Sequence, residues 1–178
     1  MGRISSINTG FWTSPQVVDN FTPEERYVYL YCLTNPRTNL CGCYEVSIKT
    51  IAFETGLERY EVRDILDRLQ HRHGAICYDA DTRELFIINW LRNHWNSSPK
   101  WVENAQRSIR RIKSRWLRLM VRAQFLRMQD MADREKRIDE LTAELDRELE
   151  WKPSTGTGTE HNAGTLRAPR QLRQGDDR

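Results

Sequence analysis

The 178-residue sequence has no long apolar run and no secretory leader. A helix that spans a bilayer needs about 20 predominantly apolar residues, and no segment of the sequence approaches that length. A signal peptide would start with a charged region followed by a hydrophobic one, and the first residues show neither. These absences predict a soluble, cytoplasmic protein without a membrane partner.

Motifs that carry enzyme chemistry are also missing. The sequence has no glycine-rich phosphate loop, no nucleophile elbow and no cluster of carboxylates or histidines at metal-ligand spacing. His71, His73 and His94 are expected in grooves or at the surface. We therefore predict a protein that is not an enzyme and binds no cofactor.

Paired cysteines are missing as well, since none of the four thiols belongs to a Cys-x-x-Cys pair. Cys41 and Cys43 share one face of an expected strand, so a metal site completed by His71 or His73 is an alternative. Zinc sites usually show paired ligands at both ends, whereas a free cysteine packs well as a small hydrophobe. We predict cysteines in the core and no metal.

Helix-breaking residues are absent between Pro99 and Pro153. This predicts a charged helical extension over residues 97–151, started by Ser98 and Pro99. Its apolar residues form two stripes at helical spacing, the second displaced by one residue from the register of the first. The first comprises Ile109, Ile112, Trp116, Leu119, Ala123 and Leu126, and the second comprises Met131, Ile138, Leu141 and Leu145. The displacement predicts a break near residues 129–130, and the polar composition of residues 152–178 predicts a disordered tail.

The sequence predicts an N-terminal arm at residues 1–10. Strong helix signals follow this arm and precede the extension. Thr22, Pro23 and Glu25 form a capping box with proline at the first helical position. This cap favours a helix over a buried strand for the apolar run at 27–33, and Asn35-Pro36 ends it.

The following residues predict two more helices and a hairpin. Ser47 caps a helix over 48–55 that Gly56 closes, and a third helix runs from about 59 to 73. The third helix buries one stripe, formed by Val62, Ile65, Leu66 and Leu69. Apolar runs at 75–78 and 85–90 flank a polar turn. The expected fold is mainly α with a small β-hairpin wing: a winged helix-turn-helix over residues 11–96, followed by the helical extension.

Several spaced motifs in this region resemble a known family. They are Phe11-Trp12, Leu33–Pro36, Thr38–Val46, Ile51–Leu57 and Asn89-Trp90-Leu91. Over roughly residues 10–100 the chain resembles phage replication-initiation proteins of the replisome-organiser type, whose winged helix is similar to the N-terminal domain of DnaD-like primosomal proteins. The resemblance implies DNA binding in the initiation of phage replication, in the host cytoplasm, with a replicative helicase or its loader as a partner.

Charge is distributed unevenly although the net charge is only +3. Residues 104–129 carry eight basic side chains and no acidic one, whereas residues 130–150 carry four basic and nine acidic ones. A basic block of this kind predicts a polyanion site. Its cations are Arg107, Arg110, Arg111, Lys113, Arg115, Arg118, Arg122 and Arg127. Trp101 and Trp116 are close enough in sequence to stack on bases, so contact with single strands as well as duplex is possible.

The third helix offers fewer DNA contacts. Arg59, Tyr60 and Arg63 are candidates for the major groove, but Asp64 and Asp67 lie at the centre of the exposed face. A solvated helix with pairs such as Asp64 to Arg68 is the alternative, and Arg83 at the wing tip is surrounded by acids.

Two other functions remain open at the level of sequence. The winged helix could be a docking module of a protein-interaction adaptor, or the chain could be a transcriptional regulator of the same fold. Residues 130–150 are expected to drive self-association, because their apolar stripe must be buried either against residues 109–126 or against another chain.

Overall fold

A computed structural model describes the backbone of residues 7–150 and the side chains of residues 7–147. The chain divides into two compact units, Met1–Glu140 and Leu141–Arg178. The expected tail at 152–178 and most of the expected N-terminal arm lie outside the described residues. Within the described part, no helix is both long and apolar enough to cross a membrane.

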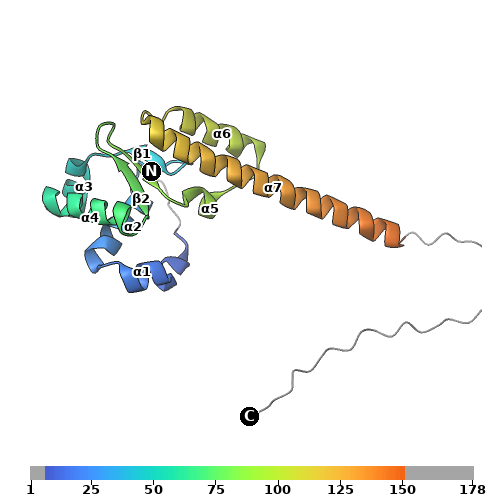
Figure 1. The fold of residues 1–178 in the computed structure, drawn as a ribbon, viewed down its shortest axis with the longest axis horizontal. Helices are drawn as coiled ribbons and strands as arrows, with labels where there is room; N and C mark the ends of the chain where they lie inside the picture. The colour runs from blue at the N-terminus through green and yellow to red at the C-terminus, as the bar shows by residue number, and fades with distance from the viewer. Residues whose placement is uncertain (1–6, 151–178) are drawn as a thin grey trace, which may run out of the picture. The chain divides into compact units, whose positions relative to one another are not determined.

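The described chain is mainly helical with one small sheet (Figure 1). The N-terminal half contains the 3-10 helix η1 (Thr9–Thr13), α1 (Pro15–Asn20), α2 (Pro23–Thr34), β1 (Cys43–Glu45), α3 (Ile48–Thr55) and α4 (Arg59–His71). The remainder contains β2 (Ile76–Asp79), β3 (Glu84–Ile87), α5 (Trp90–His94), α6 (Pro99–Arg110) and α7 (Arg115–Glu150).

The predicted helix caps are confirmed. The Thr22 hydroxyl accepts from the Glu25 N–H, and the Glu25 carboxylate accepts from the Thr22 N–H, so α2 begins with a complete capping box. The Ser47 hydroxyl accepts from the Thr50 N–H at the start of α3, and Gly56 ends that helix in the left-handed conformation. Ser98 and Pro99 start α6, as expected.

The three strands form one antiparallel sheet in the order β1-β3-β2. Strand β3 lies in the centre, and its Phe86 is opposite Cys43 on one side and Cys77 on the other. Trp90 begins helix α5 and does not continue β3, so the hairpin is shorter than the sequence predicts.

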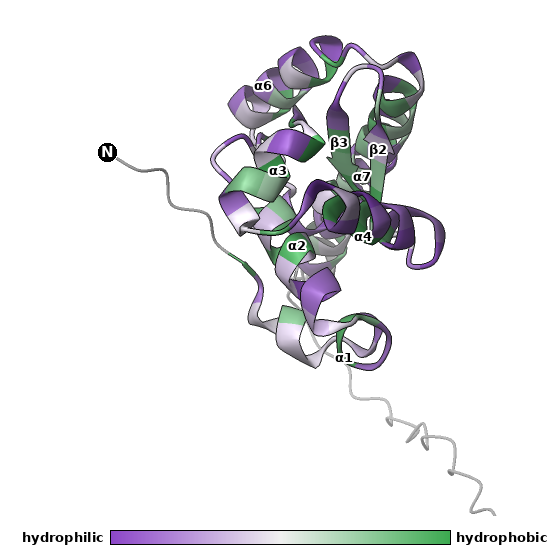
Figure 2. Ribbon diagram, turned by 90° about the vertical axis from the view of Figure 1, so that its left-hand side faces the viewer, coloured by the Kyte–Doolittle hydropathy of each residue, from purple (hydrophilic) through white to green (hydrophobic). Residues whose placement is uncertain are grey.

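The core lies where α2, α3 and α4 meet the sheet. The predicted stripe of α4, Val62, Ile65, Leu66 and Leu69, is buried, and all four cysteines are buried as well. Figure 2 shows the apolar residues that run along β2 and β3 and the largely hydrophilic ribbon of α6.

One glycine permits a close approach that ties α5 to the sheet. Gly42 has a φ of +69°, and a Cβ atom there would lie only 2.2 Å from Cγ of Trp90. The indole therefore packs directly on the backbone before β1, where any side chain would displace it.

Candidate nucleic-acid interface

The basic segment is divided by an elbow that the sequence analysis did not predict. Residues 111–114 are not helical, so α6 ends at Arg110 and α7 starts at Arg115. The predicted break near 129–130 is wrong, because α7 is continuous through those residues. The apolar stripes change register there without any interruption of the backbone.

A buried carboxylate holds the elbow. Glu84, at the start of β3, is only 4% exposed, and its carboxylate oxygens accept hydrogen bonds from the N–H groups of Lys113 (2.9 Å) and Ser114 (2.7 Å). The Ser114 hydroxyl accepts from the Leu117 N–H at 3.4 Å and so caps the first turn of α7. These bonds satisfy backbone donors at a helix N-terminus, where negative charge is also favoured.

A second carboxylate of the hairpin holds the same end of α7. Asp79, the last residue of β2, accepts from the Trp116 indole N–H at 2.8 Å. Its pKa lies below the usual value, chiefly because of a hydrogen bond from the Ser114 side chain, an effect that burial partly opposes. We call Asp79 and Glu84, together with the residues that they hold at 113–116, the hairpin clasp. The acidic residues of the β2–β3 hairpin therefore anchor a helix.

The elbow changes which face of α7 is buried. Leu117, Val121 and Phe125 pack into the core, with exposed fractions of at most 2%. Trp116, Leu119 and Leu126, which belong to the first apolar stripe of the sequence, are 42%, 58% and 53% exposed. That stripe continues the register of the buried Ile109 and Ile112 across a segment that is not helical, so its members in α7 fall on a different face from the core.

A groove with three arginines lies between α6 and the first half of α7. Its volume is about 430 Å³. It is lined by Gln106, Ile109 and Arg110 of α6 and by Arg118, Leu119, Arg122, Phe125 and Leu126 of α7. We call this the arginine groove.

The arginines of this groove have few partners among the described residues. One guanidinium nitrogen of Arg118 donates to the Ile112 carbonyl at 3.3 Å, and for Arg110 and Arg122 the described part of the chain provides no side-chain hydrogen bond or ion pair. Residues 104–129 contain no acidic side chain. The groove thus presents positive charge beside exposed apolar surface from Leu119 and Leu126, a combination suited to a phosphate backbone and its attached bases.

The other predicted cations of the extension are separated from the groove. Lys113 forms an ion pair with Glu45 at 2.6 Å, and Arg107 forms one with Glu103 at 2.8 Å. Hydrogen bonding to Lys113 lowers the pKa of Glu45, so the Glu45 carboxylate is ionised at neutral pH. Arg111 lines a different hollow that also contains Glu45 and Glu84, and Arg115 is exposed.

The structure places Arg59, Tyr60 and Arg63 on the exposed surface of the first turns of α4, outside the arginine groove. Asp67 is exposed on the same helix and lies 3.6 Å from His71. The face therefore keeps the mixed charge that the sequence indicates.

The expected pair between Asp64 and Arg68 is not formed. Arg68 instead reaches back to Glu25, whose side chain is 1% exposed and which also contacts the His73 ring at 3.2 Å. His73 was expected in a groove or at the surface, but its side chain is 4% exposed. Sequence reasoning missed this cluster around the buried Glu25 because Glu25 was assigned only to the cap of α2.

The two tryptophans proposed to stack on bases already have partners within the protein. Trp101 packs edge-on against Trp95 with ring centroids 5.1 Å apart, and the Trp116 indole donates to Asp79. Arg83 at the wing tip pairs with Glu45 at 3.1 Å. Leu119 and Leu126 are the apolar side chains that the groove offers in place of the tryptophans.

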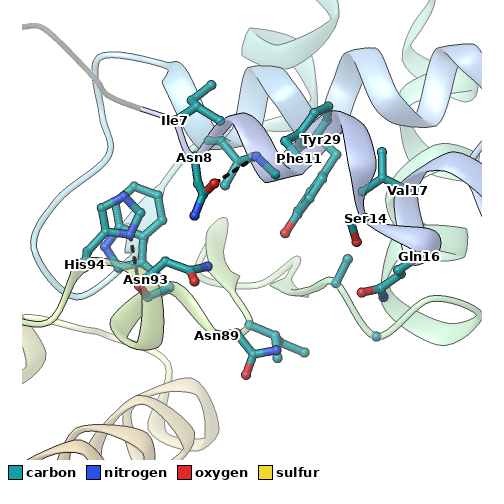
Figure 3. Close-up of a pocket in the computed structure, with 16 residues that line it drawn as sticks. Ile7, Asn8, Phe11, Ser14, Gln16, Val17, Tyr29, Asn89, Asn93 and His94 are labelled. Carbon is teal, nitrogen blue, oxygen red and sulfur yellow. Dashed lines mark hydrogen bonds between the residues drawn. The ribbon is translucent and has the colours of Figure 1, made fainter.

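A second cavity of about 330 Å³ lies elsewhere, between the N-terminal segment, α2 and α5 (Figure 3). Its polar lining includes Asn8, Gln16, Asn89, Asn93 and His94 and contains no lysine, arginine or carboxylate. Burial raises the pKa of Tyr29 to about 12, so its hydroxyl stays protonated. Such a lining does not attract a polyanion. The alternative metal site does not form, because the described residues contain no group of three or more potential ligands.

Comparisons with protein-family models, with curated proteins and with solved structures find no match to this chain. The functional argument therefore rests on the geometry of the arginine groove and on the arrangement of the elements around it.

Proposed function

We propose that this chain is a DNA-binding protein that initiates or organises phage DNA replication, with a winged helix-turn-helix and a basic helical groove as its two DNA-contacting parts. The observation that carries the proposal is the arginine groove, because it joins three cations from two helices without a neighbouring acid. Contacts of this kind bind phosphates and do not depend on sequence.

The order of elements supports the winged-helix part of the proposal. Helix α2, strand β1, helices α3 and α4 and the β2–β3 hairpin follow one another as in that fold, and the sheet order β1-β3-β2 places the hairpin beside β1. In this arrangement α4 is the helix that enters a major groove. Arg59, Tyr60 and Arg63 are the side chains available for that contact, while Asp64 and Asp67 weaken it.

The arginine groove and α4 have different roles in DNA binding, and these roles follow from their charges. The arginine groove supplies the affinity, and α4 supplies at most a modest preference for sequence. The replication role, with a replicative helicase or its loader as partner, rests on the family resemblance of residues 10–100. A transcriptional regulator would need strong sequence preference, so it is distinguished by the same binding experiment.

DNA binding is tested by titrating labelled duplex and single-stranded DNA at about 50 mM and about 200 mM salt. Replacement of Arg110, Arg118 and Arg122 by alanine should weaken binding similarly for all sequences and lower the salt slope by roughly one unit per lost phosphate contact. The matched control replaces Arg134, Lys136 and Arg137, which removes the same charge from the acidic part of α7. Equal losses in the two triple variants would show that net charge, and not the groove, determines binding.

A protein-interaction adaptor is the second candidate, and one observation favours it. Phe53 on α3 is 88% exposed and Tyr60 on α4 is 63% exposed, so the helix-turn-helix surface carries aromatic side chains suited to a protein partner. The absence of DNA binding at about 50 mM salt would favour this adaptor.

A further inference from the structure

The cavity between the N-terminal segment, α2 and α5 has no part in the proposed function (Figure 3). Its volume is about 330 Å³, and four of its lining side chains are amides: Asn8, Gln16, Asn89 and Asn93. We call it the amide cavity. Its lining also contains four rings, those of Phe11, Tyr29, Trp90 and His94. Aromatic walls with a few convergent polar groups are typical of small-molecule sites.

The hydroxyl of Tyr29 has no hydrogen-bond partner among the described residues. Figure 3 shows this hydroxyl pointing into the amide cavity. The ring is held by Phe11, which stacks on it with centroids 6.0 Å apart, and by Phe21, which meets it edge-on at 5.6 Å. Because burial raises the pKa of Tyr29 to about 12, the hydroxyl keeps its proton at neutral pH. The cavity therefore offers a ligand one well-positioned hydrogen-bond donor.

Three other polar side chains of the lining are oriented by bonds to the backbone. The Asn8 side-chain oxygen accepts from a backbone N–H at 2.8 Å, which leaves its NH₂ group to donate. The Gln16 NH₂ group donates to the His73 carbonyl at 2.7 Å, which leaves its oxygen to accept. His94 Nδ1 lies 3.0 Å from the Trp90 carbonyl and must donate to it, so Nε2 of the neutral ring accepts. The lining thus presents both donors and acceptors in defined positions.

The last two amides, Asn89 and Asn93, are available to a ligand. Asn89 precedes α5 without capping it, and neither side chain forms a hydrogen bond within the described part of the chain. A side-chain amide carries a donor and an acceptor next to each other. It therefore matches a ring edge that also carries one of each, as when asparagine binds N6 and N7 of adenine.

We propose that the amide cavity binds a nucleobase, supplied either by a free nucleoside or by an unpaired position of a nucleic-acid strand. A nucleobase is planar and uncharged, and its edge carries donors and acceptors that match amides, while its faces pack on aromatic rings. The lining contains no lysine, arginine or carboxylate, so it provides no partner for a phosphate. A volume of about 330 Å³ is at the small end of the range for ligand pockets, which suits a single base.

Calorimetric titration with adenosine, guanosine, cytidine and thymidine tests the proposal on the full chain. At least one nucleoside should bind with a Kd below about 1 mM. In a heteronuclear NMR spectrum, that nucleoside should shift the side-chain amide signals of Asn89 and Asn93 and leave the signal of Asn20 on α1 in place. The absence of binding by all four nucleosides, or shifts that spare both amides of the cavity, would overturn the proposal.

Two substitutions test the contacts. Tyr29→Phe removes the hydroxyl and keeps the ring, and Asn93→Ala removes an exposed amide, so both variants should fold. Each should weaken nucleoside binding about three- to tenfold, as expected for one lost hydrogen bond. The matched controls are Tyr27→Phe on the same helix and Asn20→Ala, because neither residue lines the amide cavity. Wild-type affinity in both Tyr29→Phe and Asn93→Ala would show that the nucleoside binds elsewhere and would overturn the proposal.

Competition identifies the source of the base. A labelled single-stranded oligonucleotide is titrated in the presence and absence of the bound nucleoside. Weaker binding of the strand with the nucleoside present supports a base of the strand in the amide cavity, whereas unchanged binding supports a free nucleoside. If the strand does not bind at all, the free nucleoside is again supported. That last result counts against the proposed function, which depends on the arginine groove and not on this cavity.

Discussion

The hairpin clasp allows a specific test of how the arginine groove is held. Replacing Glu84 by alanine removes the carboxylate that accepts the N–H groups of Lys113 and Ser114 at 2.9 and 2.7 Å. No other acceptor replaces it within the described structure. The variant should therefore loosen the elbow between α6 and α7 while leaving the capping box of α2 intact.

The size of the effect follows from the burial of the two donors. A buried donor left without a partner costs about 1–3 kcal/mol. Ser114 is 2% exposed and bears the full penalty, whereas Lys113 is an exposed residue whose N–H can recover water. We expect a total loss of about 2–4 kcal/mol, a large part of the roughly 5–15 kcal/mol that stabilises a typical domain. Glu84→Gln keeps one acceptor and should lose about half as much.

Urea unfolding measures the loss, and limited trypsin digestion locates it. The elbow contains Arg111 and Lys113 as cleavage sites, and Arg115 follows it directly. A local opening that is about 3 kcal/mol easier exposes these sites roughly a hundredfold more often. The control is Glu103→Ala, which removes an exposed carboxylate on α6. If Glu84→Ala unfolds and is digested like the wild type, Glu84 does not hold the elbow.

Three further predictions concern the core and its charges. Leu66→Ala should destabilise the protein by about 2–5 kcal/mol in a thermal melt, because the side chain is only 3% exposed; an unchanged melt would remove α4 from the core. Gly42→Ala should lower the free energy of unfolding in urea clearly more than Gly56→Ala does. Both positions have a positive φ, which costs an alanine about 1–2 kcal/mol, but only the Cβ atom at position 42 meets the Trp90 side chain. Burial alone would raise the pKa of Glu25, but hydrogen bonds from the Thr22 N–H and Arg68, and the charge of His73, hold it below its ordinary 4.5. The ionised carboxylate therefore stabilises the folded state above pH 4.5, and this stabilisation is lost as the pH falls through the lowered pKa of the folded state. Between about pH 6 and about pH 3, the free energy of unfolding of Glu25→Gln should therefore fall less than that of the wild type.

Local signals predicted much of the fold correctly. The caps at Thr22 and Ser47 act within a few residues, so the sequence contains all their partners, and the stripe of α4 follows from helical spacing alone. The elbow differs because its cause is distant: Glu84 lies about thirty residues before Ser114, and no local pattern connects them. Ser114 was a usable signal, since it is the one serine between Ile109 and Glu150.

The candidate site was predicted only in part, for a related reason. Eight cations were read as one basic block, but the elbow places three of them in one groove and Lys113 beside Glu45, and Arg107 pairs with Glu103 within α6. The first half of α7 is apolar on two faces, and periodicity cannot tell which one the core will take. That choice depends on where the helix starts, and hence on the carboxylate of Glu84.

The hairpin clasp also links the β2–β3 hairpin and the arginine groove thermodynamically. Asp79 and Glu84 border the turn of the hairpin and at the same time hold the first residues of α7. A ligand that shifts the turn must therefore change the free energy of the groove, and a ligand in the groove must change the turn by the same amount, since such coupling is reciprocal. DNA held in the groove would alter the affinity of any partner that docks on the hairpin, even where the two ligands never touch.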